Sequence, residues 1–321
     1  MGTMIDKSGR NIEYLRVSLT DRCNLRCLYC MPEKGIEKRS HFDILRFEEV
    51  EKIIRACAKL GINKVRFTGG EPLILKGIDE LIKNTASIPG IEDISITTNG
   101  ILLADMAEGL KNAGLKRVNI SIDSLKPQKY DKITRLGDIG KVFKAVEKCL
   151  SLNMVPVKLN TVLMRGINDD EIEDFIDLTV DNPIQVRFIE LMPIGEGVKY
   201  FDRCSMKVEE VLERYPELIP VEDDSKVASV YKVAGAKGSV GLISPISCKF
   251  CSLCNRIRLT ATGTIKPCLH SAEEINLKPY LKDEEKLIEV IEDTVYNKPE
   301  EHHLERDGKS DTVRMMYQIG G

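Results

Sequence analysis

Six short stretches of the chain alternate apolar with polar residues, and amphipathic stretches lie between them. This alternation predicts β-strands over residues 14–19, 64–67, 93–97, 117–122, 156–162 and 184–190. Between the first two, residues 47–60 place Val50, Ile53, Ile54 and Cys57 on one face of a predicted helix. Repeated strand–helix units predict a parallel sheet. We therefore expect an α/β fold, a partial (β/α)6 TIM-like barrel over residues 1–195.

The pattern changes after residue 195. The remaining chain mixes a short predicted helix over 208–215 with short predicted strands over 228–233 and 240–243. We expect residues 196–321 to form a smaller α+β region that closes the base of the barrel. Within the barrel, Asn168 followed by Glu171 predicts a capping pair for a helix that runs through Leu178.

The polar residues of the predicted strands all fall on one face. Parallel strands that are covered on both faces usually read as continuous apolar runs, and these do not. The apolar set must face the helices, so the polar set faces inward. It includes four cations: Arg16, Arg66, Lys158 and Arg187. The pattern predicts a wet, cationic cavity for an anionic ligand. The alternative is an antiparallel sheet with one solvated face, against which the intervening helices argue.

Composition narrows the class of protein. The chain has 321 residues, of which 42% are hydrophobic and 30% charged, and a net charge of −3. This balance is typical of a globular protein, and the small net charge favours neither a nucleic acid nor a membrane surface as partner. The first six residues lack the apolar run of a signal peptide. Ten cysteines in such a chain indicate metal sites rather than disulfides, and we expect a cytoplasmic protein.

Three cysteines follow the first predicted strand directly. Cys23, Cys27 and Cys30 have the spacing C-x3-C-x2-C, and cysteine thiolates are the usual ligands of iron–sulfur clusters. Three thiolates leave one iron of a four-iron cluster open to another ligand. A zinc knuckle is the alternative, but structural zinc takes four ligands, and the nearest further candidate, His41, has no pattern around it.

This spacing, with Tyr29 just before the last cysteine, resembles the signature of the radical S-adenosylmethionine enzymes. The resemblance implies a [4Fe–4S] cluster on Cys23, Cys27 and Cys30 whose open iron binds S-adenosylmethionine and yields a 5′-deoxyadenosyl radical. It also implies contacts to that cofactor from four residues: Tyr29, Gly70 in the segment Thr-Gly-Gly-Glu-Pro, Ser121 and Met192.

A second cysteine group lies near the C-terminus. It comprises Cys248, Cys251, Cys254 and, after a longer interval, Cys268, and Asn-Arg-Ile-Arg follows its third member. On ligand chemistry alone, structural zinc and an iron–sulfur cluster fit these residues equally well.

Three features resemble one branch of the radical S-adenosylmethionine family, the branch that begins molybdenum-cofactor biosynthesis from GTP. They are the arrangement Phe-Cys-x2-Cys-x-Arg-x-Arg, a later cysteine and a terminal Gly-Gly. The similarity runs from about Asp6 to Gly321. It implies a second [4Fe–4S] cluster on Cys251, Cys254 and Cys268, with an open iron that contacts guanine. Cys248 departs from that pattern, and we predict that it is not a ligand. The implied GTP contacts are Arg16, Arg66, Thr97, Lys158, Arg256 and Arg258, and the implied catalytic residues are Arg16, Gly320 and Gly321.

The resemblance also implies the reaction. The radical removes hydrogen from C3′ of GTP, and the carbon radical attacks C8, giving (8S)-3′,8-cyclo-7,8-dihydroguanosine 5′-triphosphate. An electron donor such as flavodoxin or ferredoxin, functional coupling to cyclic pyranopterin monophosphate synthase, and a homodimer are expected with it. Three alternatives stay open: a radical enzyme acting on a peptide, a two-cluster electron-transfer protein, and a zinc-stabilised binding scaffold.

Other cysteines and histidines have simpler interpretations. Cys57 and Cys149 continue apolar helical faces and are predicted to lie in the core. His302 and His303 stand in a charged stretch and are predicted to lie on a solvated surface, whereas Cys204 suggests no role.

Overall fold

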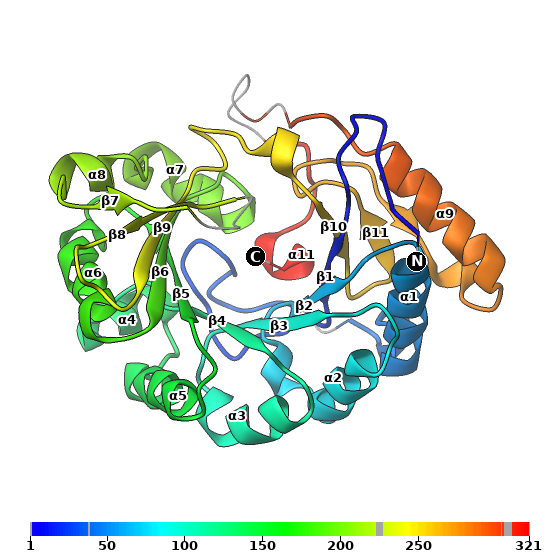
Figure 1. Ribbon diagram of the computed structural model, residues 1–321, viewed down its shortest axis with the longest axis horizontal. Helices are drawn as coiled ribbons and strands as arrows, with labels where there is room; N and C mark the ends of the chain where they lie inside the picture. Colours follow the sequence, from blue (N-terminus) through cyan, green and yellow to red (C-terminus); the bar gives the residue numbers. More distant parts are fainter. Residues whose placement is uncertain (1, 38, 223–226, 303, 305–309, 321) are drawn as a thin grey trace.

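The computed structural model describes residues 2–37, 39–222, 227–302, 304 and 310–320. Across these residues, twelve strands form one sheet in the order β12-β11-β10-β1-β2-β3-β4-β5-β6-β9-β8-β7. Figure 1 shows this sheet curving around the short helix α11 (Met316–Ile319) without closing into a full ring. The partial TIM-like barrel predicted from the alternation is therefore confirmed, and its sheet is open.

The first half of the chain supplies six strands and the helices that cover them. The strands are β1 (Tyr14–Ser18), β2 (Lys64–Thr68), β3 (Asp93–Thr98), β4 (Arg117–Ser121), β5 (Val157–Leu163) and β6 (Ile184–Glu190). The helices are α1 (Phe47–Lys59), α2 (Ile78–Ala86), α3 (Leu103–Asn112), α4 (Pro127–Thr134), α5 (Ile139–Ser151) and α6 (Ile172–Asp181). Neighbouring strands in this series are parallel, as the intervening helices predicted.

The second half extends the same sheet at both edges. Its strands are β7 (Ile219–Pro220), β8 (Ser229–Lys232), β9 (Ser239–Ile243), β10 (Arg256–Leu259), β11 (Thr264–Lys266) and β12 (Ile275–Asn276), and its other helices are α7 (Val198–Cys204), α8 (Glu210–Arg214) and α9 (Glu284–Tyr296). Strand β9 pairs parallel with β6, and β10 pairs parallel with β1. The sheet thus runs without a break across residue 195.

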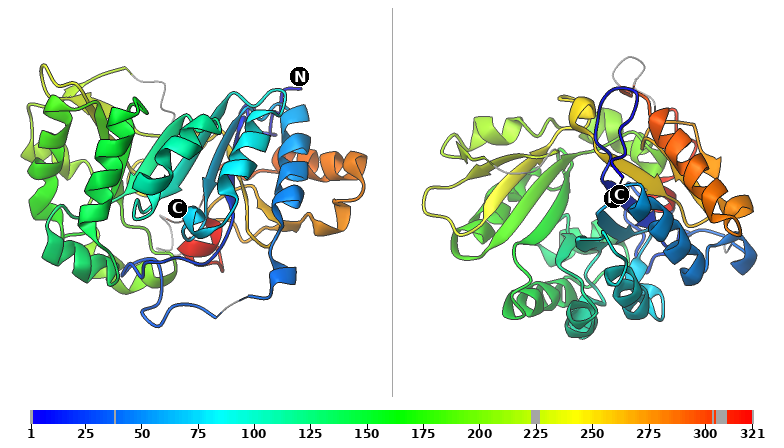
Figure 2. Two further views of the ribbon diagram at one scale, coloured as in Figure 1. Left: turned by 90° about the horizontal axis from the view of Figure 1, so that it is seen from below. Right: turned by 45° about the vertical axis from the view of Figure 1, so that its right-hand side comes forward.

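The outer helices cover the convex face of the sheet, as Figure 2 shows, and the main core is formed by apolar residues of both. The apolar residues of β1, such as Leu15 and Val17, are fully buried there, as are those of the strands beside it. Helix α1 contributes its predicted face, including Cys57, and α5 contributes Cys149. The predicted core positions of both cysteines are confirmed. Burial of the apolar face leaves the polar face of each strand pointing inward.

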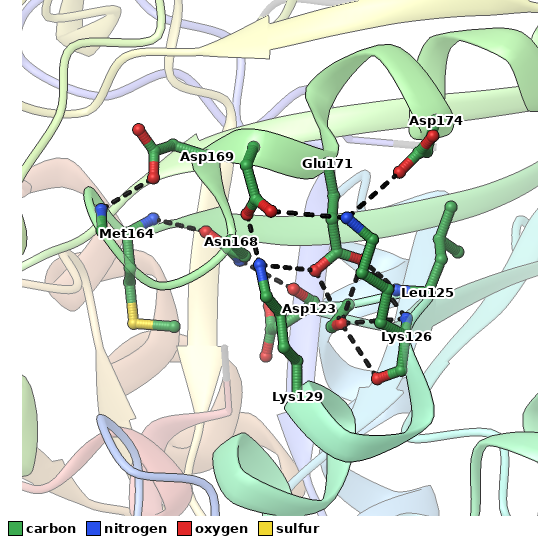
Figure 3. Close-up of polar contacts among 12 residues, drawn as sticks. Asp123, Leu125, Lys126, Lys129, Met164, Asn168, Asp169, Glu171 and Asp174 are labelled. Atoms are coloured by element: carbon green, nitrogen blue, oxygen red, sulfur yellow. Dashed lines mark hydrogen bonds and ion pairs between the residues drawn. The ribbon is translucent and has the colours of Figure 1, made fainter.

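The predicted capping pair is wrong. Helix α6 begins at Ile172 after a 3-10 turn, and neither Asn168 nor Glu171 caps it. Instead, the Asn168 amide donates to the carbonyl oxygens of Asp123 (2.7 Å) and Val162 (2.9 Å). The buried Glu171 carboxylate accepts hydrogen bonds from the loop after β4, at Ser124 Oγ (2.8 Å) and the Leu125 amide (2.7 Å). Figure 3 shows how these contacts tie the loops after β4 and β5 together. Contacts between loops have replaced the local cap.

Within the described residues, no helix is both long enough and apolar enough to cross a membrane.

Candidate active site

A cavity of about 660 Å³ lies inside the curve of the sheet. Among the described residues that line it, cations outnumber carboxylates: Arg16, Lys64, Arg66, Arg117, Lys158, Arg187, Arg256 and Arg258 stand against Glu13 and Asp93. Both carboxylates form ion pairs, Glu13 with Lys64 (2.9 Å) and Asp93 with Arg117. The cationic cavity predicted from strand parity is therefore present.

Strand register explains why the arginines converge. Arg16 of β1 stands level with Arg66 of β2 on one side and with Arg258 of β10 on the other. Burial, followed by the charges of Arg258 and Arg66, lowers the pKa of Arg16 well below its usual value. Burial and the charge of Arg256 lower the pKa of Arg258 to about 10. A bound anion would relieve this repulsion.

Buried polar atoms in and near the cavity also lack partners. Within the described part of the chain, Thr97 Oγ1, Asn160 Oδ1 and Arg256 Nε are buried and accept or donate no hydrogen bond. Buried polar groups are hydrogen-bonded in the great majority of cases, so these atoms indicate a polar ligand. Arg256 also lies over the rings of Tyr14 and Phe250, with its guanidinium carbon 6.0 and 5.6 Å from their centroids. A planar cation held by two aromatic rings is fixed in direction.

The thiols of Cys23, Cys27 and Cys30 gather in the loop after β1. Burial raises the pKa of Cys23 to about 11 and that of Cys30 to about 12. For Cys27 the charges of Asp123, Cys30 and Cys23 add to burial. Mutual effects of this kind require thiols that lie close together. Within the described residues, no group of three or more His, Cys, Asp or Glu side chains is arranged to hold a single metal ion.

Gly70 is a predicted cofactor contact, and its backbone packs too closely against the loop after β1 to leave room for a side chain. The Gly70 amide donates to the Thr20 carbonyl (2.6 Å), and a β-carbon at Gly70 would lie 2.2 Å from the Arg22 carbonyl oxygen. Next to it, the buried Glu71 carboxylate accepts from Thr98 Oγ1 (2.8 Å) and the Asn99 amide (2.7 Å). These bonds join the loops after β2 and β3, and burial raises the pKa of Glu71 to about 7.

The other predicted cofactor contacts lie around the same end of the barrel. The Tyr29 hydroxyl donates to Asp123 Oδ2 (2.7 Å), whose other oxygen accepts from the Val162 amide (2.8 Å). Met192 lines the cavity, and Ser121 ends β4 level with Asn160. Tyr29 and Asp123 are thus fixed by the loops that Asn168 and Glu171 tie together.

The second cysteine group consists of three neighbouring thiols and one exposed cysteine. Burial raises the pKa of Cys251, and the charges of Cys268 and Cys254 raise it further, so these three thiols are neighbours. Cys248 is exposed. The cavity wall includes residues next to each of the three, namely Phe250, Asn255 and Leu269, so this cysteine group borders the cationic cavity.

The end of the chain reaches into the barrel. Helix α11 lies at the centre of the curved sheet in Figure 1, and its first residue, Met316, lines the cavity. Gly320 is buried, and its carbonyl accepts a hydrogen bond from Arg258 Nη1 (2.7 Å). Its φ of +70° favours glycine, and a β-carbon would lie 2.3 Å from Thr68 Cγ2. Gly321 lies outside the described residues.

Sequence reasoning missed several residues and misplaced one. Arg117 and Tyr14 line the cavity, and alternation along their strands places both on the inward face, which was the available signal. The same alternation places Lys64 on the inward face, and Lys64 also lines the cavity. The predicted surface position of His302 is wrong. Its side chain is buried, Nε2 lies 3.1 Å from the Pro245 carbonyl, and its ring centroid is 4.5 Å from that of His270. His303 lies outside the described residues.

Cys204 packs against a small apolar cluster of Ile133, Met164 and Leu191. Its role in the structure is therefore packing.

Comparison with known proteins agrees with this geometry. The family model described as the Radical SAM superfamily matches residues 17–179, and that described as Molybdenum Cofactor Synthesis C matches residues 184–304. A GTP 3′,8-cyclase of Clostridium botulinum strain Hall is 59% identical over 319 residues, covering 99% of this chain and 100% of its own. A GTP 3′,8-cyclase of Clostridium acetobutylicum is 53% identical over 320 residues, with the same coverage.

Among solved structures, Streptococcus suis SuiB bound to S-adenosylmethionine has a TM-score of 0.54 and 16% identity, covering 91% of this chain and 66% of that chain. This likeness shows a shared fold. The family models and the identity to curated relatives over almost the whole length go further: the chain belongs to the GTP 3′,8-cyclase family of the radical S-adenosylmethionine superfamily.

Proposed function

We propose that this chain is a lyase that converts GTP to (8S)-3′,8-cyclo-7,8-dihydroguanosine 5′-triphosphate, the first step of molybdenum-cofactor biosynthesis. The observation that carries the proposal is the cavity, where eight cationic side chains face two carboxylates that are already paired. A triphosphate supplies the negative charge that such a wall requires. Neither a peptide substrate nor an electron-transfer role would account for this many cationic side chains in one cavity.

The donor sets fit two [4Fe–4S] clusters. Three partly buried cysteines, Cys23, Cys27 and Cys30, would hold the first, and Cys251, Cys254 and Cys268 would hold the second. When bound, the first cluster and S-adenosylmethionine supply the radical that removes hydrogen from C3′ of GTP. We expect the backbone at Gly70, with Tyr29, Ser121 and Met192, to bind and orient S-adenosylmethionine.

The chain's own residues orient the nucleotide. Arg16, Arg66 and Lys158 project from β1, β2 and β5 toward the cavity, and guanidinium groups bind phosphate oxygens in a fixed fork. Thr97 lies on the same face, with a buried hydroxyl available to a ligand. Arg256 and Arg258 stand next to the second cysteine group, where the guanine base would lie. Holding the reacting atoms at contact distance supplies a large part of the rate.

The tail has a catalytic role in this proposal. Arg258 is held by the Gly320 carbonyl, and Arg16 stands level with Arg258 in the sheet. Gly320 and Gly321 would therefore fix the arginine pair against the substrate once the radical has formed. Beyond the chain itself, the reaction requires an electron donor such as flavodoxin or ferredoxin, and cyclic pyranopterin monophosphate synthase would use the product. We also expect a homodimer.

The test is anaerobic reconstitution with iron and sulfide, followed by reduction with dithionite in the presence of S-adenosylmethionine and GTP deuterated at C3′. We expect 5′-deoxyadenosine that carries deuterium and a nucleotide of cyclised structure, both identified by mass spectrometry. Deuterium-free 5′-deoxyadenosine, with GTP recovered unchanged, would contradict the assigned substrate. No cleavage of S-adenosylmethionine at all would favour the two-cluster electron-transfer alternative.

A binding measurement tests the cation wall separately. Hydrogen bonds to charged groups contribute about 1.5–3 kcal/mol, so Arg256→Ala should weaken GTP binding about tenfold or more. Equilibrium dialysis with GTP measures this change, and binding of S-adenosylmethionine should stay as it is. Arg55→Ala, on the exposed face of α1, is the matched control.

A further inference from the structure

The segment that follows α9, Lys298–His302, lies against the second cysteine group. Buried contacts from this segment, and from Arg10 near the other end of the chain, reach the cysteine loops. The set formed by Arg10, Lys298 and the backbone of Pro299–His302 is called the clamp below.

Arg10 joins three distant parts of the chain. Its Nη1 donates to the carbonyl oxygens of Cys251 (2.8 Å) and Glu300 (2.7 Å), and its Nη2 donates to that of Pro299 (2.7 Å). Its Nε donates to Asp6 Oδ2 (2.6 Å), and the two side chains are 7% and 0% exposed. The buried charge is thus paired, and four of the five N–H groups of the guanidinium donate hydrogen bonds. Each bond to a backbone carbonyl fixes the path of the chain at Cys251.

Lys298 is buried in a different way. Lys298 is 2% exposed, and its ammonium group donates a hydrogen bond to the carbonyl of Pro267, the residue before Cys268. Within the described residues it has no carboxylate partner. A buried ammonium without an opposite charge is costly, so this site requires a negative group nearby.

The last member of the clamp contacts Cys251 directly. The backbone amide of His302 donates a hydrogen bond to its thiol. The clamp therefore contacts Cys251, through Arg10 and the His302 amide, and the residue next to Cys268, through Lys298. Cys248, by contrast, is exposed.

We propose that Arg10 and Lys298 are positioning residues for the second cysteine group, with Lys298 supplying the buried positive charge that balances the metal-bound thiolates. This inference rests on the proposed function, because it takes the second group to hold a cluster. Groups that orient metal ligands and set the local charge alter both the affinity of a site and its reduction potential.

The test uses the full chain, purified without oxygen, with four substitutions at two positions. Lys298→Met removes the charge and the hydrogen bond to Pro267. Lys298→Gln removes the charge but keeps a donor for Pro267, and Lys298→Arg keeps both. Arg10→Lys keeps the charge beside Asp6 but loses the fork that reaches the three carbonyls. Lys286→Met, on the exposed surface of α9, is the matched control.

We expect Lys298→Met and Arg10→Lys to lose the iron and the electron paramagnetic resonance signal of the second cluster. Cleavage of S-adenosylmethionine at the first cluster should remain. Lys298→Gln should keep the second cluster but move its midpoint potential to a more negative value, because a positive charge favours the reduced state. Lys298→Arg should restore the wild-type potential, and Lys286→Met should not differ from wild type.

Wild-type iron content and potential in both Lys298→Met and Lys298→Gln would overturn the proposal. Loss of both clusters from Lys298→Gln would also overturn it, because the role would then be general to folding. A separate measurement tests the proposed function. If the wild-type chain binds iron for only one cluster, and Cys268→Ala does not change that iron content, then the second group holds no cluster.

Discussion

Replacement of Gly320 by alanine should separate radical formation from cyclisation. The residue has a φ of +70°, and the added β-carbon would lie 2.3 Å from Thr68 Cγ2 and 2.9 Å from Thr68 Oγ1. Left-handed backbone costs a non-glycine residue about 1–2 kcal/mol. If the tail moves to relieve the contact, the bond from Arg258 to the Gly320 carbonyl is lost as well, at about 1.5–3 kcal/mol. The two effects together are about 2.5–5 kcal/mol, enough to lower the seated population of the tail by a factor of about 70 or more.

The assay compares two products of one reaction. The variant should form 5′-deoxyadenosine from S-adenosylmethionine in the presence of GTP, while the yield of cyclised nucleotide per 5′-deoxyadenosine falls steeply. Release of the last residues by carboxypeptidase should become faster, because the tail no longer lies in the cavity.

A second glycine provides the control. Gly166 has a φ of +71°, and a β-carbon there would meet no atom within 4 Å. Gly166→Ala therefore carries the same backbone strain without the collision and should leave the product ratio unchanged. Adding Thr68→Ser to Gly320→Ala removes the methyl group at 2.3 Å and should restore part of the cyclisation. An unchanged ratio in Gly320→Ala would refute the reasoning, since the tail would then not need its present position.

Three further predictions concern the cysteines and one buried acid. Cys27→Ala should abolish cleavage of S-adenosylmethionine but leave the second cluster visible by electron paramagnetic resonance; disappearance of both signals would show that the sites depend on each other. Cys248→Ser should keep its iron content and turnover, whereas Cys268→Ala should lose the second cluster, and the opposite pattern would reassign the ligands. Burial raises the pKa of Glu71 from 4.5 to about 7, so its contribution to stability is greatest below the first value and declines as pH rises through the second. Urea denaturation of the metal-free chain should show this decline in the wild type and not in Glu71→Gln; the same slope in both would contradict the shift.

The strands and their inward cations could be predicted because each depends on local sequence. Alternation with a period of two decides which face a residue occupies, whatever its neighbours are. Arg16, Arg66 and Lys158 could therefore be assigned to one cavity before any strand had been placed beside another. Lys64 and Arg117 obey the same rule, although the resemblance alone did not single them out.

The features that sequence could not give all depend on contacts between distant segments. Nothing local shows that β10 lies beside β1, or that the Glu171 carboxylate is captured by Leu125 rather than by its own helix. His302 stands among charged residues, yet its ring is buried against His270 because the chain there packs on the second cysteine group.

The pairing of β1 with β10 also bears on how the molecule is made. Arg16 emerges early from the ribosome, but its neighbour Arg258 is synthesised only when the chain is nearly complete. Until β10 has been synthesised, the edge of β1 that pairs with it is an exposed strand edge, and such edges can pair with other chains. Contacts this remote in sequence also slow folding. The thiols of Cys23, Cys27 and Cys30 are synthesised before the barrel around them can be completed. Delivery of iron during synthesis and delivery after release would therefore meet two different environments for the same three residues.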